Sequence, residues 1–365
     1  MDKKIIISGG GTGGHVFPAI SIANALKRID RDVIIHFVGA VGRLEMIKVP
    51  EAGYEISGLP VAGFERKLSI KNLSVIIRLL KSMSGARKII SSFKPDVVVG
   101  VGGYASGPIL KIAQRKGIPT IIQEQNSYAG VTNKLLARKA RLICVAYEGM
   151  EKYFPREKIL LTGNPVRKDL AELENKKKQA YRYFNLDNSL PVILVIGGSG
   201  GSRTINESVA AACEKLEKNG IQVIWQTGKF YYETIKDEFG KLKSRLVHIC
   251  DFIDRMDLAY AAADIVVSRA GAGTISELSL ASMASILIPS PNVAGDHQTK
   301  NAMALVSRKA ALMLTDNEAV LRLADTITDL VNDPGKRKSL SENISSMAFK
   351  NSDIKIAKEI LKLAE

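Results

Sequence analysis

The sequence predicts an α/β protein built from two Rossmann-like domains, each a doubly wound parallel sheet. Continuous Val and Ile runs, each followed by glycine, indicate strands buried on both faces, which is typical of parallel sheets covered by helices. The same strand, glycine loop and helix pattern opens the chain at residues 4–29 and starts again at residues 191–219. The length of 365 residues also exceeds what one hydrophobic core usually organises.

The first half contains five strand candidates. Residues 4–8 form a short apolar run that ends in glycines, and residues 18–29 follow it with the apolar spacing of a helix. The other runs have the β-branched, apolar composition of buried strands. They are residues 32–38, 96–103, 119–123 and 142–145.

The second half repeats this organisation. Residues 191–196 read as a strand, the glycines of 197–201 follow, and a helix is expected at 204–219. Further strands of the same sheet are expected at residues 222–225, 246–250, 265–268 and 285–289.

A charged helical stretch at residues 172–183 follows the junction of the two halves. We place the domain boundary at Pro165, because Gly163 and Pro165 interrupt the strand and helix pattern there. The predicted domains are therefore residues 1–165 and 166–365. By analogy with related folds, the helix-rich C-terminal end is expected to pack back on the first domain.

The charge of the chain is uneven. Lys and Arg number 52 against 37 Asp and Glu, a net charge of +15, and 25 of these basic but only 12 of these acidic residues occur up to Pro165. Such an excess fits nucleic acid, an anionic membrane or a phosphate-bearing ligand. An aromatic content of 6% and the lack of a nucleic-acid-binding motif argue against nucleic acid.

One helical segment of the first domain favours the membrane. An amphipathic helix with a basic polar face fits docking on an anionic leaflet, although an apolar face can equally belong to a core. The polar side carries Lys71, Ser74, Arg78 and Lys81. The apolar side carries Ile70, Leu73, Ile76, Ile77, Leu79, Leu80 and Met83.

Other sequence features indicate the cellular compartment and argue against a metal site. The N-terminus lacks the apolar core of a signal peptide, and the chain has no run of about 18 apolar residues. Cys144, Cys213 and Cys250 are widely spaced, which indicates neither a disulfide framework nor a zinc site. We therefore expect a cytoplasmic protein without a catalytic metal.

Glycine-rich turns follow the predicted strands in both halves. In residues 9–14, glycines let backbone amides approach a ligand, and the following helix N-terminus favours negative charge. Gly9, Gly11 and Gly14 have the dinucleotide-binding spacing, but residues 36–39 supply no acidic side chain for a ribose. A nicotinamide-dependent dehydrogenase is therefore the less favoured alternative.

Polar segments that follow the strands resemble, in the same order, the motif series of the MurG family of glycosyltransferases. The similarity runs from residue 5 to about residue 305, and the set is far more specific than any single glycine loop. The segments are residues 9–18, 102–108, 123–126, 163–167 and 268–277.

The resemblance implies a GT-B fold, in which two Rossmann-like domains face each other across a cleft. It also implies inverting transfer of N-acetylglucosamine from UDP-GlcNAc to lipid I, undecaprenyl-pyrophosphoryl-MurNAc-pentapeptide. The product, lipid II, carries a β-1,4 linkage and serves peptidoglycan synthesis. The implied place is the cytoplasmic side of the inner membrane, where the protein is peripheral. The first domain would face the acceptor and an anionic membrane surface, the second would bind the UDP-sugar, and no cofactor is implied.

The resemblance also implies site residues by position. Asn126 matches an amide contact to the sugar, Glu277 the ribose contact, and Ile253 a backbone contact to uracil. Arg167 and Ser199 match positions near the diphosphate. The residues implied to bind substrate are Thr12, Gly13, Gly14, Asn126, Arg167, Ser199, Ile253, Ala272, Gly273, Thr274, Ile275, Ser276, Glu277 and Gln298.

The sequence departs from the family pattern at one turn. It has Ala270-Gly271-Ala272-Gly273 where many members have Ser-Gly-Ala-Leu or a similar bulkier pair. The fit of this turn to a diphosphate is therefore less well defined than the role of Glu277.

An inverting transfer needs a base for the incoming hydroxyl and groups that stabilise the leaving diphosphate. His15 is the first candidate base, because imidazole accepts protons near neutral pH; alternatively, it caps or orients the glycine loop. Glu124 is the second candidate, with a buried, hydrogen-bonded carboxylate as the alternative. Another GT-B transferase acting on a lipid, such as a diacylglycerol glycosyltransferase, or a UDP-sugar epimerase remain alternative functions.

Overall fold

The computed structural model describes residues 2–61, 71–166, 170, 173–198, 200–239, 246–293 and 296–365, and for residues 71–76 it describes the backbone only. The chain divides into two compact units. The first unit comprises Met1–Val166 and Phe349–Glu365, and the second comprises Arg167–Ala348.

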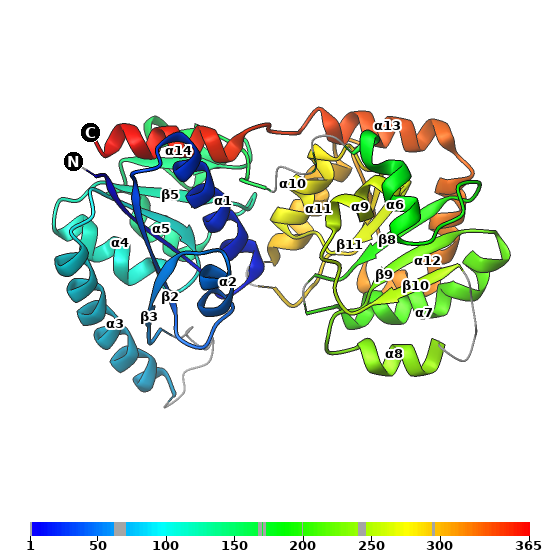
Figure 1. Cartoon of the computed structure of the whole chain (residues 1–365), viewed down its shortest axis with the longest axis horizontal. Helices are drawn as coiled ribbons and strands as arrows, with labels where there is room; N and C mark the ends of the chain where they lie inside the picture. Colours follow the sequence, from blue (N-terminus) through cyan, green and yellow to red (C-terminus); the bar gives the residue numbers. More distant parts are fainter. Residues whose placement is uncertain are drawn as a thin grey trace. The chain divides into compact units, whose positions relative to one another are not determined.

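The first unit contains a parallel sheet with the strand order β3-β2-β1-β4-β5-β6-β7, counted over the described residues (Figure 1). The predicted strands are all present, and the two edge strands, β3 and β7, were not predicted. β3 (EISGL) is interrupted by polar residues and glycine, and β7 has only three residues, so both leave a weak sequence signal. The strands are β1 Lys4–Gly9, β2 Ile34–Ala40, β3 Glu55–Leu59, β4 Val97–Gly102, β5 Thr120–Glu124, β6 Leu142–Val145 and β7 Ile159–Leu161.

Helices cover both faces of this sheet. Alternate side chains of a strand point to opposite faces, so Ile5 and Ile7 pack with α1 and α14, whereas Ile6 packs with α3, α4 and α5. Helix α1 begins at Gly13, earlier than the predicted start at Pro18, and so includes His15 in its first turn. The helices are α1 Gly13–Ile29, α2 Glu45–Glu51, α3 Lys71–Phe93, α4 Ser106–Arg115, α5 Val131–Ala137 and α14 Ser352–Leu363, and the short 3-10 turns are Met150–Lys152 and Arg156–Lys158.

The last helix, α14, completes the first unit. It lies along α1 (Figure 1), and Arg28 forms an ion pair with Asp353. Ile356 and Ile360 are buried in the same core as Ile22. Of the helix-rich C-terminal region, the first unit therefore includes α14, while α12 and α13 lie in the second unit.

The second unit contains a parallel sheet with the order β10-β9-β8-β11-β12-β13 among its described residues. Only β13, which has two residues, was not predicted. The strands are β8 Val192–Ile196, β9 Gln222–Gln226, β10 Val247–Cys250, β11 Ile265–Ser268, β12 Ser285–Leu287 and β13 Leu312–Met313.

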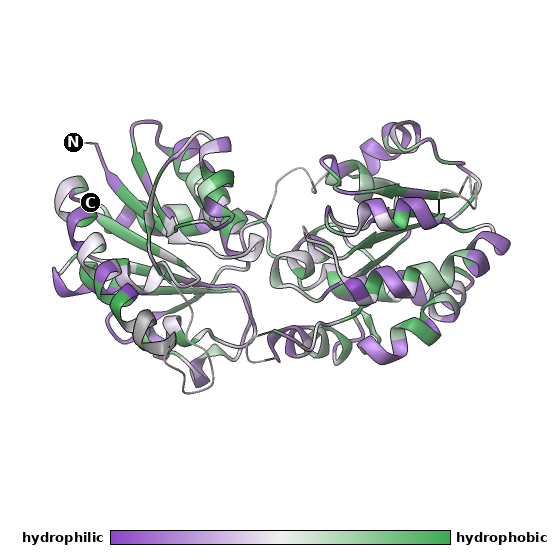
Figure 2. Cartoon of the chain, turned by 90° about the horizontal axis from the view of Figure 1, so that it is seen from below, coloured by the Kyte–Doolittle hydropathy of each residue, from purple (hydrophilic) through white to green (hydrophobic). Residues whose placement is uncertain are grey.

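Helices also cover both faces of the second sheet. One core contains Leu194 and Val266 with α6, α9, α10 and α11, and the other contains Val195 and Val267 with α7, α8 and α12. In both units, Figure 2 shows largely apolar strands flanked by helices that carry both apolar and polar residues. This arrangement confirms the predicted α/β class. The helices are α6 Lys177–Tyr183, α7 Arg203–Lys218, α8 Tyr232–Phe239, α9 Met256–Ala262, α10 Ala272–Leu280, α11 His297–Val306, α12 Asp316–Val331 and α13 Pro334–Ser345, with a 3-10 turn at Glu174–Lys176.

Across the described residues, no helix has both the length and the apolar character needed to cross a bilayer.

Candidate functional site

Glu45 supports the glycine loop of the first unit through hydrogen bonds. This side chain is fully buried at the start of α2, and its carboxylate accepts from Gly11 N at 2.8 Å and from Ala40 N at 2.9 Å. A Cβ on Gly10 would lie 2.0 Å from a Glu45 oxygen, so glycine is required there for the carboxylate to reach the loop. The shape of the loop thus depends on a side chain more than 30 residues further along the chain.

His15 lies at the carboxyl edge of the first sheet, where the adjacent strands β1, β4 and β5 end. Its Nδ1 is 3.1 Å from Oε1 of Gln125, which follows β5. The ring also lies against Gly102, because a Cβ on that residue would be 2.7 Å from His15 Cε1. Gly102 has a φ of +97°, so both its backbone conformation and the contact with the ring require glycine.

The other predicted residues of this edge surround His15 in the fold. Thr12 precedes α1 in an extended conformation, and its carbonyl accepts from His15 N at 3.1 Å. Thr12 and Gly14 are exposed, and Gly13 is half-buried. The N-terminus of a 17-residue helix here favours an anionic ligand. Asn126 directly follows Gln125 at the same edge.

Glu124 is buried, and its carboxylate accepts four hydrogen bonds. Oε1 accepts from the backbone and the side-chain amide of Asn126 at 3.1 and 3.2 Å, and Oε2 accepts from Gly130 N and Asn133 Nδ2 at 2.9 and 2.8 Å. These four donors engage both carboxylate oxygens and hold the side chain in place. The geometry therefore favours the structural alternative for Glu124, an anchor for Asn126, over the role of general base.

In the second unit, a glycine loop follows β8. Gln226 connects this loop to the loop that follows β10. Its Nε2 donates to Gly198 O at 3.1 Å, and its Oε1 accepts from Ile253 N at 2.9 Å. With its N–H engaged in this way, Ile253 would make the predicted backbone contact through its carbonyl group. Ser199 and Arg167 lie outside the described residues.

The turn after β11 leads into α10, which carries six predicted residues, Ala272 to Glu277. Gly271 precedes the helix in an extended conformation, and Ser276 Oγ donates to Ala272 O at 3.0 Å. The half-buried Glu277 accepts a 3.2 Å hydrogen bond from the hydroxyl of Tyr260, which is fully buried in α9. A Cβ on Gly273 would meet no atom within 4 Å. The fold therefore has room at this position for the larger side chain that many family members carry.

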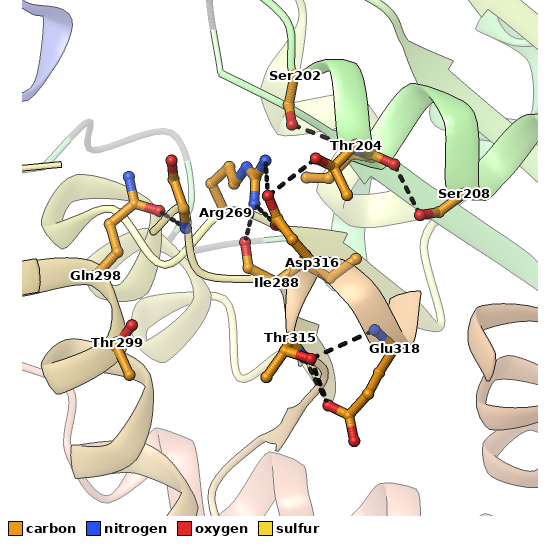
Figure 3. Close-up of polar contacts among 12 residues, drawn as sticks. Ser202, Thr204, Ser208, Arg269, Ile288, Gln298, Thr299, Thr315, Asp316 and Glu318 are labelled. Carbon is orange, nitrogen blue, oxygen red and sulfur yellow. Dashed lines mark hydrogen bonds and ion pairs between the residues drawn. The ribbon is translucent and has the colours of Figure 1, made fainter. Parts of the chain in front are cut away.

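A network of polar contacts stabilises the turn between β11 and α10 (Figure 3). Arg269 donates to Ile288 O at 3.0 Å and forms an ion pair with Asp316, which also accepts from Thr204 Oγ1 at 2.9 Å. Arg269 therefore ties the end of β11 to the first turns of α7 and α12. Gln298 lies nearby at the start of α11, and its Oε1 accepts from Ser290 N at 2.9 Å.

The cysteines take no part in this chemistry. Burial raises the pKa of each thiol, Cys144, Cys213 and Cys250, to about 12, so all three stay protonated at neutral pH. Across the described ranges, no group of three or more His, Cys, Asp or Glu side chains is arranged to hold a metal ion.

Sequence reasoning missed Glu45, Gln125, Tyr260 and Arg269 as supports of the predicted residues. Gln125 and Arg269 stand inside recognised motifs, so their position beside a candidate residue was an available signal. Glu45 and Tyr260 stand in segments with ordinary helical composition. Only the folded arrangement shows that their side chains reach Gly11 and Glu277.

Two family models match the chain. The glycosyltransferase family 28 N-terminal domain matches residues 5–145, and the glycosyltransferase family 28 C-terminal domain matches residues 192–360. The chain is also similar to a crystal structure of Acinetobacter baumannii MurG, with a TM-score of 0.77, 26% identity and 99% of each chain covered. These matches confirm the GT-B fold predicted from the sequence.

Fold similarity alone does not separate the enzymes that share this architecture. A UDP-GlcNAc 2-epimerase from Neisseria meningitidis bound to UDP-GlcNAc has a TM-score of 0.70 at 14% identity, with 98% of this chain and 100% of that chain covered. At this identity the likeness concerns the fold only. Sequence identity to named relatives is therefore the stronger criterion.

Curated relatives match along the whole chain. A protein of Bacteroides thetaiotaomicron is 56% identical, with 100% of this chain and 99% of the relative covered. A protein of Flavobacterium psychrophilum is 50% identical, with 99% and 98% covered. Both are named UDP-N-acetylglucosamine–N-acetylmuramyl-(pentapeptide) pyrophosphoryl-undecaprenol N-acetylglucosamine transferase. On this similarity, the chain belongs to the MurG family within glycosyltransferase family 28.

Proposed function

We propose that this protein transfers N-acetylglucosamine from UDP-GlcNAc to lipid I and so forms lipid II. The observation that carries the proposal is identity of 50–56% over essentially the full length to relatives named for this reaction. The geometry of both sheets supports it, because each carboxyl edge combines a glycine loop, a helix N-terminus and ordered polar side chains, a combination suited to a nucleotide-sugar.

The proposed chemistry assigns a proton acceptor to the first unit. The acceptor hydroxyl oxygen forms a bond to the anomeric carbon, the bond from that carbon to the diphosphate breaks, and UDP leaves with the electron pair. His15 takes the hydroxyl proton. In the second unit, the amides at the start of α10 and the loop after β8 stabilise the diphosphate charge as it develops.

The test is transfer of radiolabelled N-acetylglucosamine from UDP to a synthetic lipid I analogue, with UDP-glucose as the control donor. The proposal requires labelled product with UDP-GlcNAc and little or none with UDP-glucose. Binding of UDP-GlcNAc without transfer would move the assignment to another lipid or sugar acceptor.

Glu277 is proposed to accept hydrogen bonds from the ribose hydroxyls of the donor. Replacing Glu277 with glutamine should weaken UDP-GlcNAc binding about 10- to 100-fold, because a hydrogen bond to a charged group contributes about 1.5–3 kcal/mol. Calorimetric titration measures the change. Glu342→Gln, which alters an exposed carboxylate of α13, is the matched control and should bind normally. Equal affinities of the two variants would refute the role of Glu277.

We also propose that the first unit docks on an anionic membrane surface, on the cytoplasmic side of the inner membrane. Ile77 and Leu80 of α3 are 49% and 65% exposed, and Arg78 and Lys81 beside them are exposed as well. Exposed apolar side chains with adjacent basic residues fit the boundary between headgroups and acyl chains. Of the apolar side predicted from the sequence, Ile70 and the side chains of Leu73 and Ile76 lie outside the described residues.

Sedimentation with lipid vesicles tests this docking. Binding should be strong with vesicles that contain phosphatidylglycerol and should be lost with neutral phosphatidylcholine vesicles, because the basic residues lose their attraction. The double variant Ile77→Asp/Leu80→Asp should bind the acidic vesicles at least about tenfold more weakly. Leu321→Asp, at an 80% exposed leucine of the second unit, is the control. Undiminished binding to neutral vesicles would refute the proposal.

A further inference from the structure

Three buried side-chain amides lead to His15 in the first unit. Gln123, Gln125 and Asn164 are 0%, 2% and 3% exposed, respectively. Amide groups in such positions are destabilising unless each is hydrogen-bonded. Their contacts form one continuous chain, which begins and ends at the backbone.

The two ends of this chain fix its direction. A backbone carbonyl oxygen only accepts hydrogen bonds. Gln125 must therefore turn its NH2 group toward Val101 O, at 2.6 Å, and Asn164 must turn its NH2 group toward Gln125 O, at 3.0 Å. The orientation of both amides follows from the identity of their partners.

The middle of the chain agrees with both ends. Gln123 Nε2 donates to Asn164 Oδ1 at 2.9 Å, and Gln123 Oε1 accepts from Gln125 Nε2. Rotating any one of the three amides by 180° would place two donors or two acceptors face to face in the core. Each reversal would leave a polar group buried and unsatisfied, which is strongly destabilising.

These hydrogen bonds fix the side-chain oxygen of Gln125 next to the His15 ring. Gln125 Oε1, which can only accept, is 3.1 Å from His15 Nδ1. In the neutral ring Nδ1 must then carry the hydrogen, and Nε2 has the lone pair. The contact of the ring with Gly102 holds its plane in this position.

We propose that Gln125, oriented by Gln123 and Asn164, is a positioning residue that fixes His15 in the Nδ1–H tautomer and so makes Nε2 the proton acceptor. The inference rests on the proposed function for its consequence in catalysis. The tautomer itself is a property of the free protein. An acceptor on the far nitrogen is a general means of setting which imidazole nitrogen acts as the base.

Nuclear magnetic resonance of the full-length protein, labelled with 15N at its histidine rings, tests the tautomer directly. The chain has four histidines, and a His15→Gln variant identifies the signals of His15. Long-range 1H–15N correlations should show His15 with the hydrogen on Nδ1 in the neutral form. A neutral His15 with the hydrogen on Nε2 would overturn the inference, whatever the activity of the protein.

Two variants of Gln125 test the mechanism. Gln125→Met keeps the approximate volume but removes the accepting oxygen, so the His15 signals should move toward the Nε2–H form, and kcat for transfer should fall about tenfold. KM for UDP-GlcNAc should stay within about twofold, because donor contacts are unchanged. Gln125→Glu keeps an oxygen toward Nδ1 and should retain the Nδ1–H signal, although it loses the donor to Val101 O and Gln123 Oε1 and should be less stable.

Gln114→Met is the matched control. Gln114 is a half-buried glutamine of α4 whose amide donates to Leu136 O at 3.0 Å, away from His15. It should leave both the tautomer and kcat unchanged. An unchanged tautomer in Gln125→Met would refute the role of Gln125, whereas a changed tautomer in a protein that transfers no sugar would refute only the proposed function.

Discussion

Replacing His15 with glutamine should lower kcat for sugar transfer by about 10²- to 10⁴-fold, the contribution typical of a positioned general base. Glutamine can still hydrogen-bond at this position, but it cannot take a proton from the acceptor hydroxyl at neutral pH. Binding of UDP-GlcNAc should change little, because the donor contacts proposed for Glu277 lie in the second unit. Steady-state kinetics with the lipid I analogue and calorimetric titration with UDP-GlcNAc measure these two effects.

His36→Gln is the control for the loss of a histidine from the same unit. His36 lies in β2, where its Nε2 is 2.8 Å from Ser57 Oγ, and burial lowers the pKa of its ring. A glutamine can make the same contact, so kcat should stay within about threefold. A His15→Gln variant that retains full kcat would show that His15 orients the glycine loop, the alternative drawn from the sequence.

Replacing Glu45 with alanine should lower the free energy of unfolding by about 1–3 kcal/mol. The substitution removes the acceptor for the buried Ala40 N, and an unsatisfied buried amide costs about 1–3 kcal/mol. It also removes the acceptor for Gly11 N, which is exposed and can bond to water instead. Urea unfolding followed by circular dichroism measures the change. Trp225, the single tryptophan of the chain, lies in the second unit, so its fluorescence shows whether that unit is affected.

Glu51→Ala is the matched control on the same helix. Glu51 is exposed and forms an ion pair with Lys48, and exposed ion pairs contribute about 0–1 kcal/mol. Its unfolding should therefore be close to that of the unchanged protein. Glu45→Ala should also reduce transfer activity at temperatures where it is folded, since the loop before His15 loses its support. Equal stability of the two variants would show that the Glu45 carboxylate does not hold the loop.

Local sequence patterns determined the strands, the glycine loops and the family. Buried strands of parallel sheets are continuous apolar runs, and a glycine run between strand and helix marks a ligand-binding turn, so both are legible within about ten residues. The order of the motifs then led to His15, Asn126 and Glu277. The edge strands β3 and β7 were not predicted, because β3 contains polar residues and glycine and β7 has only three residues.

Only the tertiary structure decided which side chains hold the candidate residues in place. Glu45 meets Gly11 across 34 residues, and Gln125 meets His15 across 110. Such contacts depend on the strand order, which brings the ends of β1, β4 and β5 to one edge of the sheet. No local sequence pattern shows which distant residues meet there. The four donors to Glu124 lie within nine residues of it, and the folded conformation of the segment after β5 turns them toward the carboxylate, which favours a structural role over that of a base.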